Sequence, residues 1–206
     1  MSDLKQAIKQ NYLKCAKEPS YFINQFCTIQ HPQRGKIKFK LYPFQYDVLK
    51  EYQANDYNVI LKSRQLGIST LSAAYSLWMM LFQNDKNILV IATTKDTAKN
   101  LITKVRVMYE ALPAWLKTAI VENNKLSLVF KNGSQIKAIA SNESAGRSEA
   151  LSLLILDEAA FIEKIDVIWT AAQQTLATGG RCLAISTPNG VGNWFHKTWQ
   201  DAKDGA

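Results

Sequence analysis

The chain has 206 residues, 47% of them hydrophobic and 20% charged, with a formal net charge of +8 at pH 7. This composition is typical of a globular protein with a sizeable core, and the positive charge favours a polyanionic partner such as nucleic acid or a nucleotide. The three cysteines and two histidines have no metal-ligand spacing, which argues against a metal cluster and favours a reducing compartment. The amino terminus lacks the apolar core of a signal peptide and no apolar run is long enough to span a bilayer, so we expect no membrane segment.

The first 40 residues are expected to form one amphipathic helix over residues 3–16, followed by an irregular, basic segment up to about Leu41. Pro43 is expected to open a short helix, because proline is favoured in the first helical turn. From there on, strongly apolar strands alternate with helices, which predicts an α/β fold with a mainly parallel central sheet flanked by helices. The strands are expected at residues 57–61, 87–92, 151–156 and 181–185, and the helices at 69–83, 95–111, 164–176 and 192–203.

One stretch interrupts this alternation, at residues 125–140. Two runs of alternating apolar and polar residues surround Asn132-Gly133, and Asn-Gly is a strong signal for a tight hairpin turn. We therefore expect a β-hairpin insertion here, followed by a loop at residues 141–149.

A variant phosphate-binding loop follows the strand at residues 57–61. The usual P-loop reads G-x-x-x-x-G-K-[ST] between a strand and a helix, and Gly67 and Ser69 occupy its second glycine and hydroxyl positions. Ile68 stands where the lysine belongs, whereas Lys62 stands at the first glycine position, from which its side chain could reach the β- and γ-phosphates. Taken alone, this loop could also be a plain strand-turn-helix junction. The residues expected to bind the nucleotide are Lys62, Ser63, Arg64, Gln65, Leu66, Gly67, Ile68, Ser69 and Thr70.

Two adjacent acids, Asp157 and Glu158, end an apolar strand in the pattern of a Walker B motif. Asp157 is expected to bind Mg²⁺ together with Ser69, and Glu158 is expected to polarise the attacking water. Side chains at a strand end point in different directions, so one acid can face the metal and the other the γ-phosphate. A solvated strand end explains one acid better than two. Together with the loop upstream, the pair predicts a site that hydrolyses ATP with Mg²⁺.

A third motif follows the strand at residues 181–185. Ser186, Thr187 and Asn189 are placed to sense the γ-phosphate and to relay its loss. Hydroxyl and amide side chains after a buried strand suit this coupling role, although an ordinary Thr-Pro-Asn-Gly turn explains the same residues.

Three further side chains complete the predicted site. Phosphoryl transfer needs positive charge on the developing oxygens, so Arg64 and Arg147 are both candidate arginine fingers, with structural salt bridges as the alternative. The amide of Gln45 can donate to and accept from the edge of adenine. The basic and aromatic residues at 34–44 could contact nucleic acid, but a solvated strand that packs Phe39 on the core explains them better.

Taken together, these motifs resemble the ATPase domain of the large terminase subunit, the DNA-packaging motor of tailed bacteriophages. The resemblance covers roughly residues 40–200, with the motifs in the family's order. Some terminases carry the P-loop lysine next to the second glycine and others at the start of the loop, and this chain looks like the second kind. The matching motifs are Tyr42-Pro-Phe-Gln45, Lys62–Thr70, Asn132-Gly133-Ser134, Gly146-Arg147, Leu156–Phe161 and Ser186–Gly190.

The resemblance implies a P-loop NTPase fold of the additional-strand (ASCE, RecA-like) type, and ATP hydrolysis that translocates double-stranded viral DNA into a procapsid. It implies a homo-oligomeric ring, a pentamer, at the portal protein, with the small terminase subunit as a further partner, in the cytoplasm of an infected bacterium. It also implies adenine recognition by Gln45, metal binding by Ser69 and Asp157, and catalysis by Glu158. Finally, it implies coupling through residues 186–190, and it leaves arginine-finger duty divided between two positions, those of Arg64 and Arg147.

The resemblance also suggests how the chain is divided. Residues 1–40 are expected to form an N-terminal helix and basic segment, and residues 41–206 the P-loop ATPase domain. Terminases normally continue into a nuclease domain of RNase H type, which we do not expect within these 206 residues.

Two other functions fit part of the pattern. A superfamily 2 helicase also uses an upstream glutamine and an Asp-Glu pair, but it normally has a lysine at position 68, His or Asp at position 160 and a second RecA-like domain. This chain has Ile68 and Ala160 instead. A non-hydrolysing scaffold that binds nucleic acid or the portal is the second alternative, but it has no use for a catalytic acid such as Glu158.

Overall fold

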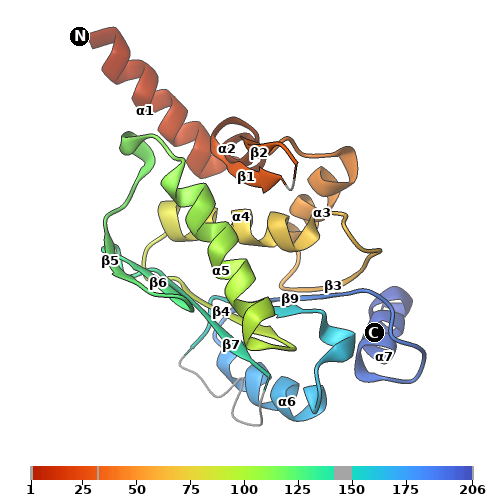
Figure 1. The fold of residues 1–206 in the computed structure, drawn as a ribbon. Helices are drawn as coiled ribbons and strands as arrows, with labels where there is room; N and C mark the ends of the chain where they lie inside the picture. Colours follow the sequence, from red (N-terminus) through yellow and green to blue (C-terminus); the bar gives the residue numbers. More distant parts are fainter. Residues whose placement is uncertain (1, 32, 142–149, 206) are drawn as a thin grey trace.

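In the computed structural model, which describes residues 2–31, 33–141 and 150–205, a central β-sheet lies between two layers of helices (Figure 1). The sheet has seven strands in the order β3-β9-β8-β4-β7-β6-β5. Five of them are parallel, and β5 and β6 extend the β7 edge in antiparallel fashion. The strands are β3 (Tyr57–Leu61), β4 (Asn87–Ala92), β5 (Ile120–Asn123), β6 (Ser127–Phe130), β7 (Gln135–Ala140), β8 (Leu153–Asp157) and β9 (Arg181–Ser186).

Helices cover both faces of this sheet. Along β4, Ile88 and Val90 pack with α4 and α5, whereas Leu89 and Ile91 pack with α6. Successive side chains of a strand point to opposite faces, so a continuous apolar run needs helices on both sides. The mainly parallel α/β architecture predicted from the sequence is thereby confirmed. The helices are α3 (Pro43–Ala54), α4 (Ile68–Phe82), α5 (Lys95–Glu110), α6 (Ile165–Leu176) and α7 (Trp194–Asp204).

The N-terminal segment is more regular than the sequence analysis expected. The helix predicted at residues 3–16 is α1 (Ser2–Lys17), but the stretch after it is not irregular: it contains α2 (Pro19–Phe26) and an antiparallel hairpin of β1 (Thr28–His31) and β2 (Gly35–Lys38). Pro19 opens α2 in its first turn, and the helix buries two apolar side chains completely. Basic residues alternate with less exposed residues along β2, which is the period-two pattern of a strand. The sequence analysis read this stretch as an irregular basic segment because of its charges.

The predicted hairpin around Asn132-Gly133 is confirmed, because β6 and β7 lie on either side of it. Gly133 has φ of +80°, which glycine adopts without strain, and the Asn132 side chain donates to the carbonyl of Met80 at 2.8 Å. The hairpin is therefore tied to the end of α4. The sequence analysis missed the 3₁₀ helix at Ala114–Leu116 and the strand β5. The loop expected at residues 141–149 lies outside the described residues beyond Ser141.

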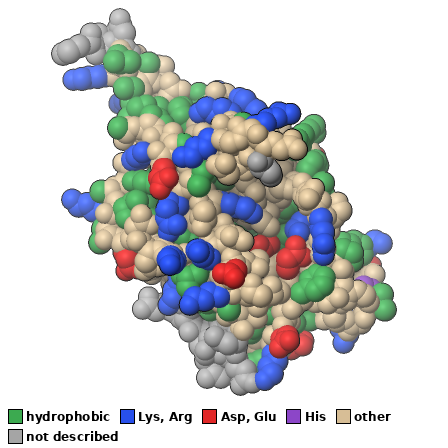
Figure 2. Space-filling view, viewed as in Figure 1, with side chains coloured by type: hydrophobic (Ala, Val, Ile, Leu, Met, Phe, Trp, Pro, Cys, Tyr) green, Lys and Arg blue, Asp and Glu red, His purple; other side chains and the backbone are tan. Residues whose placement is uncertain are grey.

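Lys and Arg side chains are spread over the molecular face in Figure 2, above the N-terminal hairpin and along α5, and acidic residues lie among them. Phe39 is only 4% exposed, so the basic segment does pack this ring on the core as predicted. Within the part of the chain that the structure describes, no helix has the length and apolar character needed to cross a membrane.

Candidate nucleotide-binding site

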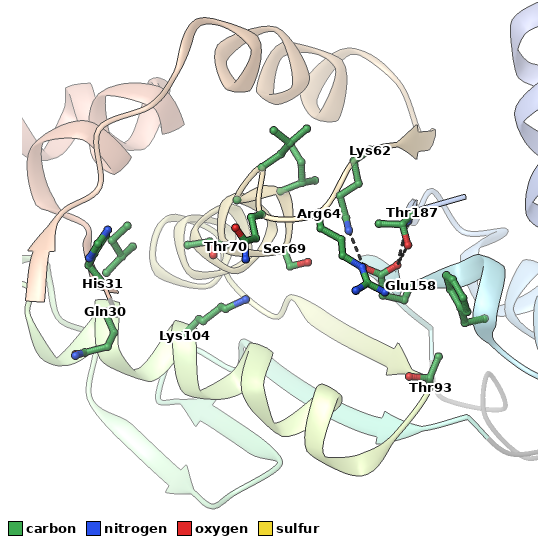
Figure 3. A pocket seen from close by; sticks show the side chains of 16 residues that line it. Gln30, His31, Lys62, Arg64, Ser69, Thr70, Thr93, Lys104, Glu158 and Thr187 are labelled. Atoms are coloured by element: carbon green, nitrogen blue, oxygen red, sulfur yellow. Dashed lines mark hydrogen bonds and ion pairs between the residues drawn. The ribbon is translucent and has the colours of Figure 1, made fainter. Parts of the chain in front are cut away.

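A cavity of about 890 Å³ opens at the carboxyl ends of the parallel strands. The loop after β3 forms one wall, and residues at the ends of β4, β8 and β9 line its base (Figure 3). Helix α5 and strand β1 complete the lining. Ligands of open parallel α/β sheets bind at this end of the strands, so the position suits a substrate site.

The variant phosphate-binding loop borders the cavity, and all of its predicted residues except the exposed Ser63 line it. Gly67 is the N-cap of α4 with φ of +73°, and a Cβ there would lie 2.9 Å from Gln45 Nε2, so the position requires glycine. Ile68, in place of the usual lysine, is 2% exposed and belongs to the core. A lysine at this position would bury an ammonium among apolar side chains, so the cation must come from another part of the loop.

Lys62 and Glu158 form an ion pair across the cavity. Lys62 Nζ donates to Glu158 Oε1 at 2.7 Å, although the two residues are 96 positions apart. Glu158 directly follows β8 in the left-handed conformation, with φ of 56°. This strained backbone at a functional position is offset by the contacts of its side chain. The structure thus places the displaced lysine opposite the predicted catalytic acid.

The second oxygen of the Glu158 carboxylate is bound by the end of β9. Oε2 accepts hydrogen bonds from the backbone N–H and from Oγ1 of Thr187, both at 3.0 Å. Burial by itself raises the pKa of Glu158, but the hydrogen bonds from Lys62 and Thr187 and the charge of Lys62 outweigh it, so the pKa is lowered. Glu158 is therefore a carboxylate at neutral pH, as a general base requires.

Ser69 and Asp157 lie together beside this pair. Ser69 Oγ donates to Asp157 Oδ1 at 2.9 Å, and Asp157 is 6% exposed. Burial raises the pKa of Asp157, against the opposing effects of the Ser69 hydrogen bond and the charge of Lys104. A carboxylate and a hydroxyl are hard oxygen ligands that suit Mg²⁺. Among the described residues no group of three or more His, Cys, Asp or Glu side chains could hold a metal, so this pair fits an ion whose other ligands are phosphate and water oxygens.

Of the two predicted arginines, Arg64 lies among the described residues. Arg64 is exposed and lines the same cavity as Glu158 (Figure 3). No hydrogen bond or ion pair joins it to another described residue, which leaves its five donors for a ligand. Arg147 lies outside the described residues.

Gln45 occupies an unexpected environment for a residue predicted to recognise adenine. It is 1% exposed, its Oε1 accepts from the backbone N–H of Tyr42 at 3.1 Å, and its Nε2 donates to the carbonyl of Leu66 at 2.9 Å. The amide therefore ties the start of α3 to the phosphate-binding loop. Adenine recognition by Gln45 stays a prediction, and it requires the amide to reach the base while holding this loop.

The predicted coupling residues gather around the Walker B acids. Ser186 Oγ accepts from the backbone N–H of Ala160 at 3.1 Å, and Asn189 Nδ2 donates to the carbonyl of the same residue at 2.9 Å. Together with the two hydrogen bonds of Thr187 to Glu158, these contacts join the end of β9 to the segment after β8. Only Thr187 among the three lines the cavity itself.

Several cavity residues were missed by the sequence analysis, and one of them carries a charge. Lys104 projects from α5 toward Ser69 and Thr70 (Figure 3). A sequence signal existed, since this lysine lies three residues after Leu101 and four before Met108, on the buried stripe of the helix. Phe161 lies in the Leu156–Phe161 motif but was given no role, and the other missed residues, Ile29, Gln30, His31 and Thr93, come from segments without a recognisable motif.

Comparisons with known proteins show the family of the chain. The family model described as "Terminase large subunit, T4likevirus-type, N-terminal" matches residues 59–206. The chain belongs to this family of large terminase subunits. A curated relative of the terminase chain is the Mu-like prophage FluMu protein gp28 of Haemophilus influenzae, which is 37% identical over 78 residues, or 38% of this chain. The chain spans only 15% of the length of that relative in this match.

Solved structures show the same fold. The large terminase ATPase domain of Thermus phage P74-26 is 24% identical with a TM-score of 0.62, over 77% of this terminase chain and 69% of the other. The large terminase of a thermophilic bacteriophage, solved in complex with ADP, is 17% identical with a TM-score of 0.64, over 80% of this chain and 43% of the other. At these identities the matches establish the RecA-like α/β fold of the terminase chain.

Proposed function

We propose that this terminase domain hydrolyses ATP and that hydrolysis drives translocation of double-stranded viral DNA into a procapsid. The observation that carries the proposal is the meeting of Lys62, Glu158 and Thr187 at one end of the cavity, next to the Ser69–Asp157 pair. Membership in the large terminase family and the ADP complex of the relative from a thermophilic phage support a nucleotide as the ligand.

Binding of ATP would use the loop and the amino terminus of α4. The backbone N–H groups there favour phosphate oxygens, and Lys62 adds a charge-assisted contact. Ser69 and Asp157 would hold Mg²⁺, which supplies positive charge to the phosphate oxygens when it is bound. Thr70 lies next along α4 and borders the same space. Gln45 is proposed to recognise adenine while it anchors the loop at Leu66.

Catalysis requires a rearrangement of the Lys62–Glu158 pair. Both oxygens of Glu158 are engaged, Oε1 by Lys62 and Oε2 by Thr187. When Lys62 turns to a phosphate, Oε1 becomes free to accept a hydrogen bond from the attacking water, while Thr187 still fixes the orientation of the carboxylate. Arg64 would stabilise charge on the transferred group, and Arg147 is the second candidate for that role.

Coupling and assembly are proposed from the site and the family together. Thr187 donates a hydrogen bond to Glu158, and Asn189 donates one to Ala160. A movement of Glu158 would therefore displace the residues that follow β9. We propose the portal protein, the small terminase subunit and double-stranded DNA as partners of a pentameric ring in the infected host cell. We also propose that residues 41–206 form the ATPase unit, with residues 1–40 as an addition whose β1 strand lines the cavity.

Calorimetric titration with Mg²⁺-ATP tests the site, because the loop, Lys62, Ser69 and Asp157 all belong to this one chain. We expect clear binding by the parent chain and a loss of about ten-fold or more in Lys62→Ala, which is the worth of one charge-assisted phosphate contact. Absence of binding by the parent would contradict the proposal. Unchanged binding by Lys62→Ala would show that another residue supplies the positive charge that binds the phosphates, and Arg64 would be the first candidate.

A further inference from the structure

Helix α5 directs one lysine into the nucleotide cavity. Lys104 is half-buried and lines the cavity together with Ser69 and Thr70. In Figure 3 its ammonium group extends from α5 toward the amino terminus of α4, whereas Lys62 and Arg64 approach from the opposite side, near Glu158. The cavity is therefore bordered by cations on two sides.

The inward direction of Lys104 follows from its place on the helix. Leu101 and Met108, three residues before and four residues after it, are each 1% exposed. Residues at these spacings lie on one face of an α-helix, and this face of α5 packs against α4 and the sheet. The position would ordinarily be apolar, and the long lysine stem can lie along the apolar stripe while the ammonium reaches the cavity.

Lys104 differs from Lys62 and from Arg106 of its own helix in having no hydrogen-bond or ion-pair partner among the described residues. Lys62 pairs with Glu158, and Arg106 donates to Asn123 at 2.8 Å, but within the same described ranges no hydrogen bond or ion pair reaches Lys104 Nζ. Burial lowers the pKa of Lys104, and Asp157 opposes this shift. A sheltered ammonium without a partner lowers stability, so its retention in the cavity points to an anion that binds there.

We propose that Lys104 contacts the phosphates of the bound nucleotide from the α5 side, beside Ser69 and Thr70. The inference rests on the proposed nucleotide-binding function and adds a second phosphate-binding lysine to it. Glu158 marks the end of the cavity at which the terminal phosphate is attacked, and Lys62 lies at that end. Lys104 lies on the other side of Ser69, so it contacts phosphates that ATP and ADP share.

The test compares Lys104→Met with Lys99→Met, an exposed lysine of the same helix that does not line this cavity. Dissociation constants for Mg²⁺-ATP and Mg²⁺-ADP are measured by calorimetry on the whole chain, together with the unfolding temperature without nucleotide. We expect Lys104→Met to weaken both nucleotides about ten-fold or more, with an unchanged or raised unfolding temperature, because it removes a charge-assisted contact and an unpaired sheltered charge. Lys99→Met is expected to change neither.

Several results would overturn the inference. Unchanged affinity for both nucleotides would remove Lys104 from the phosphate site, and a loss for ATP alone would place it at the terminal phosphate instead. A lowered unfolding temperature, found again with Lys104→Gln, would make the lysine a structural partner of Asp157. Weakened binding by Lys62→Ala with normal binding by Lys104→Met would reject this inference while the proposed function stands. A parent chain that binds neither nucleotide would reject both.

Discussion

The two ends of the nucleotide cavity are organised differently. At one end, Lys62 and Thr187 donate hydrogen bonds to Glu158, so this proposed catalytic acid is ionised and both of its oxygens are engaged. Beside them Asp157 is held by the Ser69 hydroxyl and has a raised pKa, and on the α5 side of the cavity Lys104 has no hydrogen-bond or ion-pair partner among the described residues. Lys104 is therefore free to bind an anion, whereas Glu158 must first lose its hydrogen bond from Lys62 before Oε1 can accept one from water.

The largest expected effect comes from removing the acid of the paired end. Glu158→Gln keeps the shape of the side chain, but its single amide oxygen can replace only one of the two carboxylate oxygens that accept from Lys62 and Thr187, and the amide cannot take a proton from water. We expect kcat for ATP hydrolysis to fall by about 10²–10⁴-fold, with the ATP dissociation constant changed little. Steady-state kinetics and calorimetry check this, with the exposed Glu163→Gln as the matched control.

Equal rates in Glu158→Gln and the parent would show that the paired end is not catalytic. Binding by the parent without any hydrolysis, in the ring as well as in the single chain, would favour the scaffold alternative.

The ion pair itself predicts a pH dependence of stability. Glu158 has its pKa lowered below the ordinary value of 4.5, so its pairing stabilises the folded state above that value and is lost as pH falls through the lowered pKa. Lys62→Met should therefore lower the free energy of unfolding by about 1 kcal/mol at pH 7, and by less as the pH falls below 4.5. Urea unfolding at several pH values measures the difference, and the exposed Lys197→Met serves as control. A difference that grows toward acidic pH would contradict the pairing.

The smallest expected effect concerns the loop between the two ends. Gln45→Ala removes the hydrogen bond to Leu66, so affinity for both ATP and GTP should fall a few-fold, and ATP should lose more because only ATP carries adenine. Competition binding with the two nucleotides distinguishes the contributions. Equal losses would restrict Gln45 to anchoring the loop, and no loss for either nucleotide would remove it from the site.

Local patterns along the chain predicted much of the fold. Apolar runs located β3, β4, β8 and β9, and Asn132-Gly133 located the hairpin, because strand and turn formation depend on near neighbours. The basic segment before α3 was mispredicted for the opposite reason. Its strand β2 is recognisable only once its apolar residues are seen to pack on the rest of the chain.

The motifs alone also identified the acids, the displaced lysine and the glycine of the loop, since these depend on residue type and order. Only the tertiary structure joined Lys62 to Glu158 across 96 positions and Ser69 to Asp157 across 88, turned Lys104 into the cavity and closed the amide of Gln45 onto Leu66. These contacts depend on how strands and helices distant in the chain pack against one another, and no local pattern encodes that. The sequence by itself indicated the acids and the phosphate-binding loop of the candidate site, but not Lys104. The packing of the sheet and its helices decided which of them are paired and which are left to meet a ligand.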